Sequence, residues 1–350
     1  MKDLRVGLRP AGAIGAPGER GGAKAARQQM FRRIVPEKGA DAPAATSAGA
    51  VAAPGRPLRV ALLVAARPRQ WIKNLLVFAA PLAAGVLSQP GALGRTAVAA
   101  ATLATASAGV YLINDVIDAP ADRLHPVKRR RPVASGDLPA PIAAVAGIAA
   151  IALALAASVV LAGVALTVIV GAYATVSISY CLWLKGQAVI EMACVSSGFV
   201  LRAVAGGAAV GVVVSPWFIL VTSATAVLIV AGKRTAEQGT LSKAAPSHRS
   251  VLGRYPATFL LTVRVTAGAV AIISYALWAF ERSVYSSIHT TYDIMFQLSI
   301  LPFVIGILLV ELAVESGGGA APEEMVLGNR ALQLLGLACV TLIAVGIYAR

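Results

Sequence analysis

The chain has 350 residues, of which 57% are hydrophobic and 13% are charged. Soluble domains usually carry about 25% charged residues, so this composition excludes an ordinary soluble enzyme and a disordered chain, and it indicates an integral membrane protein. The net charge of +15 does not point to nucleic-acid binding, because the cytoplasmic loops of membrane proteins collect Lys and Arg.

Residues 1–57 differ from the rest of the chain. They are rich in Ala, Gly, Pro and Arg and lack a sustained apolar period, so we expect a disordered basic N-terminal tail that could touch anionic lipid. A start at Met30 is an alternative for this stretch. We expect residues 58–350 to form one transmembrane domain.

A series of apolar runs of near-transmembrane length follows, and a helix needs about 20 residues to cross the hydrocarbon core. Nine such runs lie at 72–88, 93–113, 140–161, 164–184, 188–212, 215–232, 257–280, 294–313 and 328–348. We therefore predict an all-α integral membrane bundle of nine transmembrane helices. Lys and Arg concentrate before the first span and after the second, fourth and sixth, which places those ends in the cytoplasm and the C-terminus outside.

An acidic motif closes the second predicted span. Asn114, Asp118 and Asp122 are spaced four residues apart, so on a helix they share one face. Mg²⁺ prefers hard oxygen ligands and usually shares them with substrate phosphates, so these three side chains are candidate metal ligands. A solvated, charged helix end beside a basic loop is the alternative. Pro120 can distort the last turn of this helix and so displace Asp122 from the shared face.

A run of cations follows the acidic motif and includes Lys128, Arg129 and Arg131. Carboxylate-held Mg²⁺ flanked by Lys and Arg is a common way to bind a diphosphate. As an alternative, these cations could serve only to orient the chain in the membrane. That role would explain the cations but not the adjoining acidic residues. The exits of the fourth and sixth spans add Lys185 and the pair Lys233–Arg234, which could converge on the same cavity.

The fifth predicted span carries Glu191 and Arg202. Ionisable residues within a membrane usually face the bundle interior. Eleven residues separate them by about 16 Å along a helix, which is too far for a direct ion pair. Each therefore needs another partner, either a residue on another helix or, for Arg202, a substrate phosphate. The three Cys and three His residues are scattered and predict neither a disulfide framework nor a zinc site.

Taken together, these motifs resemble the UbiA superfamily of intramembrane prenyltransferases. In that family an Asn-Asp-x-x-Asp-x-x-x-Asp motif closes the second helix, and here it reads Asn114, Asp115, Asp118 and Asp122. A second motif, Asp-x-x-x-Asp, normally closes the sixth helix. This chain departs from it and has Lys233, Arg234 and Glu237 instead.

One branch of the superfamily fits the departure: the decaprenyl-phosphate phosphoribosyltransferases of actinobacterial cell-wall synthesis. The similarity covers about residues 65–350. It is carried by Arg67-Pro68-Arg69-Gln70-Trp71-x-Lys73-Asn74, Tyr111-Leu112-x-Asn114-Asp115-Val116, Asp122-Arg123-x-His125-Pro126-x-Lys128-Arg129-x-Arg131-Pro132, Gln187-Ala188-Val189-x-Glu191, Val195-Ser196-Ser197, Arg202-Ala203-x-Ala205-Gly206-Gly207, Ala231-Gly232-Lys233-Arg234-x-Ala236-Glu237 and Leu277-Trp278-Ala279-Phe280-Glu281.

The resemblance implies Mg²⁺-dependent transfer of 5-phosphoribose from 5-phosphoribosyl-1-diphosphate (PRPP) to a polyprenyl (decaprenyl) phosphate, releasing diphosphate, for arabinan precursors. The catalytic domain would face the cytoplasm from the inner (plasma) membrane. The roles it implies fall into three groups. The metal ligands are Asn114, Asp118 and Asp122; the catalytic residues are Asp118, Asp122 and Lys128; the substrate-binding residues are Lys73, Tyr111, Lys128, Arg129, Arg131, Lys185, Arg202, Lys233 and Arg234.

Two other functions remain open at this point. An aromatic prenyltransferase of the same superfamily would use a prenyl diphosphate as donor, and the missing second acidic motif counts against it. A multi-pass transporter without chemistry would place charges deep in several spans, whereas here nearly all charges sit at one membrane face. The sequence leaves open whether the chain forms a homo-oligomer.

Overall fold

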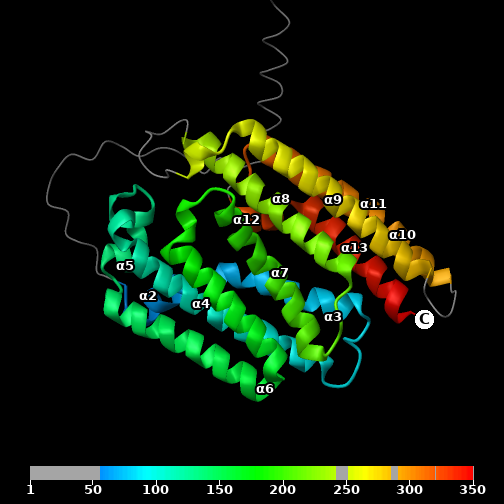
Figure 1. The fold of residues 1–350 in the computed structure, drawn as a ribbon, viewed down its shortest axis with the longest axis horizontal. Helices are drawn as coiled ribbons and strands as arrows, with labels where there is room; N and C mark the ends of the chain where they lie inside the picture. The colour runs from blue at the N-terminus through cyan, green and yellow to red at the C-terminus, as the bar shows by residue number, and fades with distance from the viewer. Residues whose placement is uncertain (1–55, 242–250, 285–290, 320, 350) are drawn as a thin grey trace, which may run out of the picture. The chain divides into compact units, whose positions relative to one another are not determined.

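The computed structural model describes residues 56–241, 251–284, 291–319 and 321–349. Within these ranges every regular element is a helix and no strand occurs (Figure 1), which confirms the predicted all-α class. Apart from its last two residues, the predicted tail at 1–57 lies outside the described residues.

The elements include five 3₁₀-helices, labelled η, among the α-helices. In chain order they are α2 (Leu58–Ala65), η1 (Pro68–Phe78), α3 (Ala79–Ala83), α4 (Ala92–Leu124), η2 (Lys128–Arg130), α5 (Pro132–Ser135), α6 (Ala140–Leu182), η3 (Leu184–Gly186), α7 (Ile190–Val210), α8 (Pro216–Leu241), η4 (Leu252–Arg254), α9 (Ala257–Val284), η5 (Thr291–Asp293), α10 (Ile294–Leu298), α11 (Ile300–Glu315), α12 (Pro322–Gly328) and α13 (Arg330–Tyr348).

Seven helical stretches in the described part of the chain are long and apolar enough to cross a membrane: α4, α6, α7, α8, α9, α10 with α11, and α13. Helix α6 folds back on itself at Gly163, where φ is 80° and ψ is −176°. A Cβ placed on Gly171 would lie 3.9 Å from the Leu155 side chain, whereas a straight helix would separate these residues by about 24 Å. The two arms of α6 correspond to the predicted spans at 140–161 and 164–184.

The first predicted span, 72–88, is not a continuous α-helix, so the described residues do not reproduce the predicted count of nine transmembrane helices exactly. The chain instead forms η1 followed by the short helix α3. Pro81 cannot donate to the carbonyl of Val77. That carbonyl points at α7, where a Cβ on Gly206 would lie 1.8 Å from the Val77 oxygen. Glycine at 206 therefore lets the irregular segment dock closely on α7.

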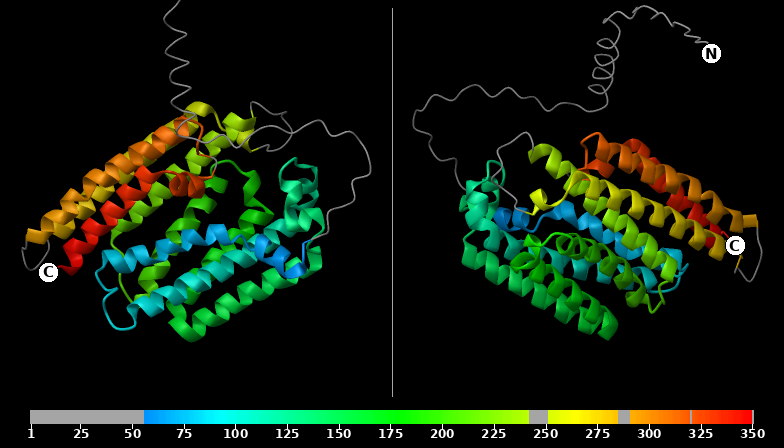
Figure 2. Two further views of the ribbon diagram at one scale, coloured as in Figure 1. Left: turned by 180° about the vertical axis from the view of Figure 1, so that it is seen from behind. Right: turned by 45° about the horizontal axis from the view of Figure 1, so that its top comes forward.

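Helix α7 is central in the arrangement, because it touches α4, α6, α8 and η1. Helix α4 packs along α6, and α8 along α9, as the views in Figures 1 and 2 show. At the crossing of α4 and α6 two glycines face each other. A Cβ on Gly109 would lie 2.6 Å from the Gly147 carbonyl oxygen. Small residues at such crossings allow the close packing typical of membrane helices.

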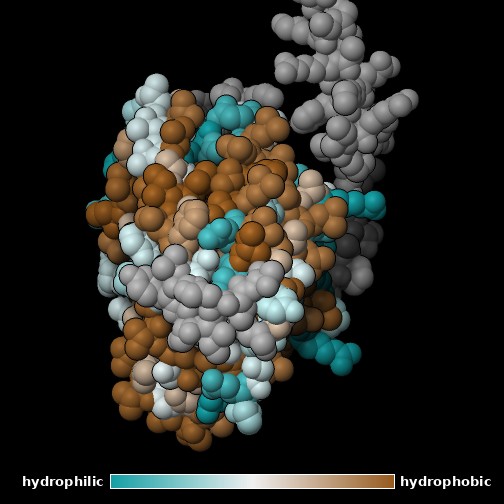
Figure 3. All heavy atoms as spheres, turned by 90° about the vertical axis from the view of Figure 1, so that its right-hand side faces the viewer, coloured by the Kyte–Doolittle hydropathy of each residue, from teal (hydrophilic) through white to brown (hydrophobic). Residues whose placement is uncertain are grey.

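The outer faces of the helices are apolar. On α11 and α13 the side chains of Leu301, Leu312, Leu334 and Leu337 are each more than 60% exposed. Figure 3 shows such apolar residues, in brown, covering much of one side of the molecule. Contiguous apolar surface of this extent is rare on soluble proteins and suits contact with lipid chains. The chain is therefore an integral membrane protein.

Candidate active site

A cavity of about 740 Å³ lies between η1, α4, the second arm of α6 and α7. Among the described residues, eight Lys or Arg side chains line it: Arg67, Lys73, Lys128, Arg131, Lys185, Arg202, Lys233 and Arg234. The three carboxylates in this described lining belong to Asp118, Asp122 and Glu191. Because cations outnumber carboxylates, the cavity favours ligands that carry several negative charges.

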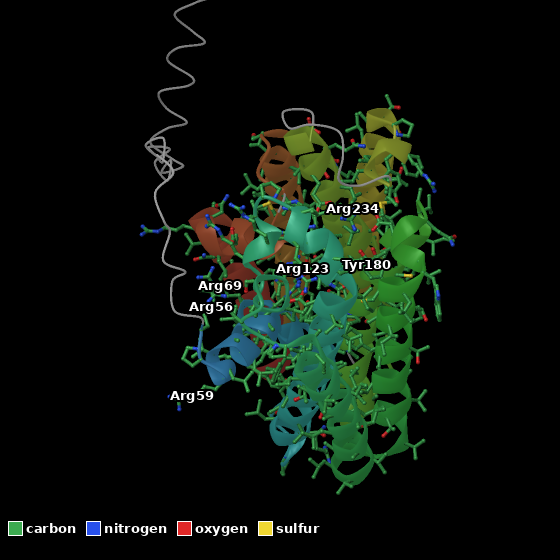
Figure 4. The ribbon with its side chains drawn as sticks, turned by 90° about the vertical axis from the view of Figure 1, so that its left-hand side faces the viewer. Arg56, Arg59, Arg69, Arg123, Tyr180 and Arg234 are labelled. Atoms are coloured by element: carbon green, nitrogen blue, oxygen red, sulfur yellow. The ribbon has the colours of Figure 1, made fainter. Side chains whose placement is uncertain are left out.

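The helices bring together side chains that are far apart in sequence. Every predicted site residue except Arg129 lines this cavity. Arg129 lies in η2 with an exposed side chain. In Figure 4, Arg59 projects from the side of the molecule, whereas Arg234 and Tyr180 lie among the helices that surround the cavity.

The acidic motif lies on the last turns of α4, which continues past Pro120 to Leu124. The Asn114 side chain donates from Nδ2 to Asp118 Oδ2 at 3.0 Å. The Lys185 ammonium donates to the other oxygen of Asp118. Arg131 Nη1 donates to Asp122 Oδ2 at 2.6 Å. Each carboxylate of the motif that faces the cavity is thus neutralised by a cation of the same site.

Asp115 belongs to the same motif but is absent from the cavity lining. It is 2% exposed and pairs with Arg67 and, at 3.5 Å, with Arg131. The Arg67 guanidinium also lies 4.8 Å from the centre of the Tyr111 ring. Neither Arg67 nor Asp115 was predicted as a site residue. The structure assigns them the positioning of Arg131 and Tyr111.

The donor set of the acidic motif fits a divalent cation held jointly with a phosphate. Among the described residues, no three His, Cys, Asp or Glu side chains lie close enough together to hold a metal on their own. Mg²⁺ needs fewer protein ligands, because it binds through one or two carboxylates plus substrate phosphates and water. Asp118 and Asp122, with the amide oxygen of Asn114, would supply these oxygens.

Glu191 finds its partner on another helix. The Arg234 guanidinium binds both Glu191 oxygens, with Nε at 2.7 Å from Oε1, and Nη1 donates to Glu237 Oε2 at 2.6 Å. Arg234 is 4% exposed and Glu191 is 2% exposed. Two carboxylates therefore already engage the cation that we predicted to bind substrate, and this geometry favours a structural role for Arg234.

Arg202 is also held by neighbouring groups. It donates to Asn74 Oδ1 at 2.9 Å, to the Gly198 carbonyl at 2.7 Å and to the Tyr173 hydroxyl at 2.9 Å. These bonds fix the guanidinium in the cavity wall. Asn74 and Tyr173 were not predicted as site residues, and only the fold reveals their contact with Arg202.

A segment between α8 and α9 closes one side of the cavity, where Val251 and Leu252 contribute to the lining. Gln238 Nε2 donates to the carbonyls of Leu252 and Tyr255, both at 2.8 Å. The pKa of the Tyr255 hydroxyl is raised, mainly because the side chain is buried. Tyr255 therefore keeps its proton at neutral pH and can donate to Glu191 Oε1 at 3.3 Å.

The model of the UbiA prenyltransferase family matches residues 75–314. The chain is 39% identical over 298 residues to the decaprenyl-phosphate phosphoribosyltransferase of Corynebacterium glutamicum. The aligned residues make up 84% of this chain and 89% of that protein. It is 37% identical over 305 residues to the protein of the same name from Mycobacterium tuberculosis H37Rv, covering 85% of this chain and 97% of the relative.

Two solved structures share the fold. A UbiA homolog from Archaeoglobus fulgidus bound to GPP and Mg²⁺ has a TM-score of 0.63 and 18% sequence identity, covering 83% of this chain and all of that one. A digeranylgeranylglyceryl phosphate synthase has a TM-score of 0.59 and 14% identity, covering 83% of this chain and 99% of that one. At these identities the likeness establishes the arrangement of helices alone.

Proposed function

Because the chain belongs to the UbiA prenyltransferase family, as its motifs predicted, we propose that it transfers 5-phosphoribose from PRPP to the phosphate of a polyprenyl (decaprenyl) phosphate. The observation that carries the proposal is the cavity lining, in which the described residues supply eight Lys or Arg side chains against three carboxylates. Two phosphorylated substrates require such an excess of cations. The names of the relatives that are 37–39% identical support the same reaction.

The cations divide between two places in the cavity. Arg67, Arg131 and Lys185 adjoin the acidic motif, where each already contacts a carboxylate. We assign this end to the diphosphate of PRPP. Lys73 and Lys233, on η1 and α8, line other parts of the wall and would contact the ribose 5-phosphate or the phosphate of the acceptor.

The reaction would replace the bond between ribose C1 and the diphosphate oxygen by a bond between C1 and an oxygen of the acceptor phosphate. Lys128 and Arg131 would stabilise the negative charge that grows on the leaving diphosphate. The acceptor needs no strong base, because a phosphate monoester has a second pKa of about 6 and is already anionic at pH 7. The described lining residues accordingly include no histidine.

Asn114, Asp118 and Asp122 would hold Mg²⁺. When bound, the cation would neutralise part of the charge of the diphosphate. The chain's own part is to present two carboxylates and one amide oxygen on a single face of α4, within reach of Lys185 and Arg131.

The membrane explains how the acceptor reaches the site. Its polyprenyl chain is as apolar as the exposed Leu, Ile and Val side chains on the outer helix faces, so the chain would remain in the bilayer while its phosphate enters the cavity. The cavity would open to the cytoplasm at the inner (plasma) membrane, where the ends of α4, α6 and α8 carry the basic residues.

A UbiA-type prenyltransferase acting on an aromatic acceptor is the second candidate, favoured by the structural neighbour bound to GPP and Mg²⁺. A prenyl donor would need a lining of mainly apolar side chains. Here polar side chains such as Gln70, Ser177 and Tyr180 line the cavity together with the cations, and these suit the hydroxyls of a ribose.

The two candidates can be separated by offering both donors to the purified protein in nanodiscs. One reaction would contain PRPP with decaprenyl phosphate, and the other a prenyl diphosphate with 4-hydroxybenzoate, each with Mg²⁺. We expect product only in the first. Product only in the second would replace our proposal by the prenyltransferase.

A further inference from the structure

The connection between α6 and α7 contains an unusual backbone turn. The Ile190 N–H donates to the Ala188 carbonyl at 2.8 Å, and between them Val189 has φ 69° and ψ −50°. This is a γ-turn of the positive-φ type, which is rare and strained in proteins. A β-branched residue is poorly suited to it, because its Cβ substituents crowd the backbone at positive φ.

One side chain contacts this turn directly. The Tyr255 hydroxyl accepts the Val189 N–H at 2.7 Å and donates to Glu191 Oε1 at 3.3 Å. The Glu191 carboxylate in turn accepts hydrogen bonds from Nε and Nη2 of Arg234. Tyr255 is 4% exposed, and its ring stacks on Phe259 with centroids 5.8 Å apart. The hydroxyl therefore joins the strained turn to a fixed ion pair.

The same connection carries a cation of the cavity. Lys185 lies in η3, four residues before the turn, and its ammonium contacts Asp118 of the acidic motif. Arg254 Nη1, next to Tyr255, donates to the Gly186 carbonyl at 3.3 Å. The segment 251–255 thus contacts the connection at two points.

Strained backbone persists only where surrounding contacts hold it, and such strain concentrates at functional sites. Loss of the Tyr255 hydroxyl would leave the Val189 N–H without this partner and let the turn relax to negative φ. A rotation at Val189 would shift the connection and move Lys185 away from Asp118.

We propose that Tyr255 is a positioning residue, whose hydroxyl holds the strained turn at Val189 and thereby places Lys185 at the diphosphate end of the cavity. The inference rests on the proposed function for the identity of the ligand. It does not require Tyr255 to touch substrate, and Tyr255 is absent from the cavity lining.

The test uses Tyr255→Phe, which keeps the ring and its stacking on Phe259. We expect kcat for phosphoribosyl transfer to fall about ten- to a hundredfold, the size of effect that a small misplacement of a catalytic group produces. Val189→Gly should restore most of this loss in the double variant, because glycine adopts positive φ without strain and keeps the turn unaided. If Tyr255 only stabilised the fold, Val189→Gly would not restore kcat.

Tyr348→Phe is the matched control. The Tyr348 hydroxyl also accepts a backbone N–H, that of Leu87 at 3.1 Å, but lies outside the cavity lining. We expect it to leave kcat within about twofold of the wild type. Unchanged kcat in Tyr255→Phe, or a loss that Val189→Gly does not restore, would overturn the inference.

A second variant covers the case in which Tyr255→Phe does not fold. Gln238→Ala removes the two bonds that anchor the Tyr255 segment. It should lower kcat and be rescued by Val189→Gly in the same way. Absence of that rescue would again count against the inference.

A binding measurement separates this inference from the proposed function. If the wild type transfers no phosphoribose, the proposed function fails, and the variants are compared by the rise in unfolding temperature that Mg²⁺ with inorganic diphosphate causes. We expect a rise in the wild type, a smaller one in Tyr255→Phe and recovery in the double variant. An equal rise in Tyr255→Phe, or no rise in the wild type, would reject the role of Tyr255.

Discussion

The buried ion pair between Glu191 and Arg234 gives a prediction that separates a structural role from substrate binding. In Arg234→Met the long apolar side chain fills the space of the arginine stem but leaves the Glu191 carboxylate unpaired. That carboxylate is 2% exposed, and the one side-chain hydrogen bond it keeps within the described part of the chain comes from Tyr255 at 3.3 Å. An uncompensated buried charge costs about 3–5 kcal/mol.

For a domain of this size each kcal/mol lowers the unfolding temperature by about 2–4 °C, so Arg234→Met should unfold roughly 10 °C below the wild type. The double variant Glu191→Gln/Arg234→Met removes both charges, and its stability should return to within about 2 kcal/mol of the wild type. Arg123→Met, on the exposed end of α4, removes one cation from the surface and should change stability by less than about 0.5 kcal/mol.

The assay is thermal unfolding of the purified protein in detergent, followed by the fluorescence of a thiol-reactive dye on the cysteines, of which Cys181 is buried and Cys194 and Cys339 are half-buried. A double variant no more stable than Arg234→Met would refute the reasoning. So would an Arg234→Met protein as stable as the wild type, and either result would return Arg234 to the candidate substrate ligands.

Three further results are expected. Lys185→Met removes the cation that contacts Asp118 and should lower kcat for phosphoribosyl transfer about ten- to a hundredfold, the value of a charge-assisted hydrogen bond, as initial rates at saturating PRPP would show; a fall of less than threefold would contradict this. Lys128→Met should reduce transfer, whereas Arg129→Met, outside the cavity lining, should retain it; equal losses in the two variants, measured by the same assay, would speak against the assignment. Gly109→Val should prevent α4 from packing on α6, because its Cβ would lie 2.6 Å from a carbonyl oxygen; a monodisperse peak of normal yield in size-exclusion chromatography would disprove that.

Much of the fold follows from local patterns in the sequence. Apolar length places most of the membrane helices, and the break between the predicted spans at 161 and 164 coincides with the reversal at Gly163. The irregular η1 was missed because hydropathy records apolar content but not whether backbone hydrogen bonds form. Pro81 was the available signal, since it frees the Val77 carbonyl that contacts α7.

The candidate site, too, could be predicted only in part from the sequence. Spacing on one helix suffices for the placement of Asn114 and Asp118 together, because i and i+4 share a face. The pairing of Glu191 with Arg234 could not be predicted, because it depends on how α7 and α8 pack. The contact of Tyr255 with Val189 joins residues 66 positions apart. A single sequence contains no local signal for either contact.

The central claim is phosphoribosyl transfer at the acidic motif of α4. Its most direct test is transfer of ribose-labelled PRPP to decaprenyl phosphate in membranes, with Mg²⁺ or EDTA, for the wild type and for Asp118→Asn. We predict Mg²⁺-dependent label in the lipid fraction for the wild type and its loss in Asp118→Asn. Equal labelling in the variant would contradict the assignment of the motif, and an unlabelled lipid fraction with the wild type would contradict the reaction itself.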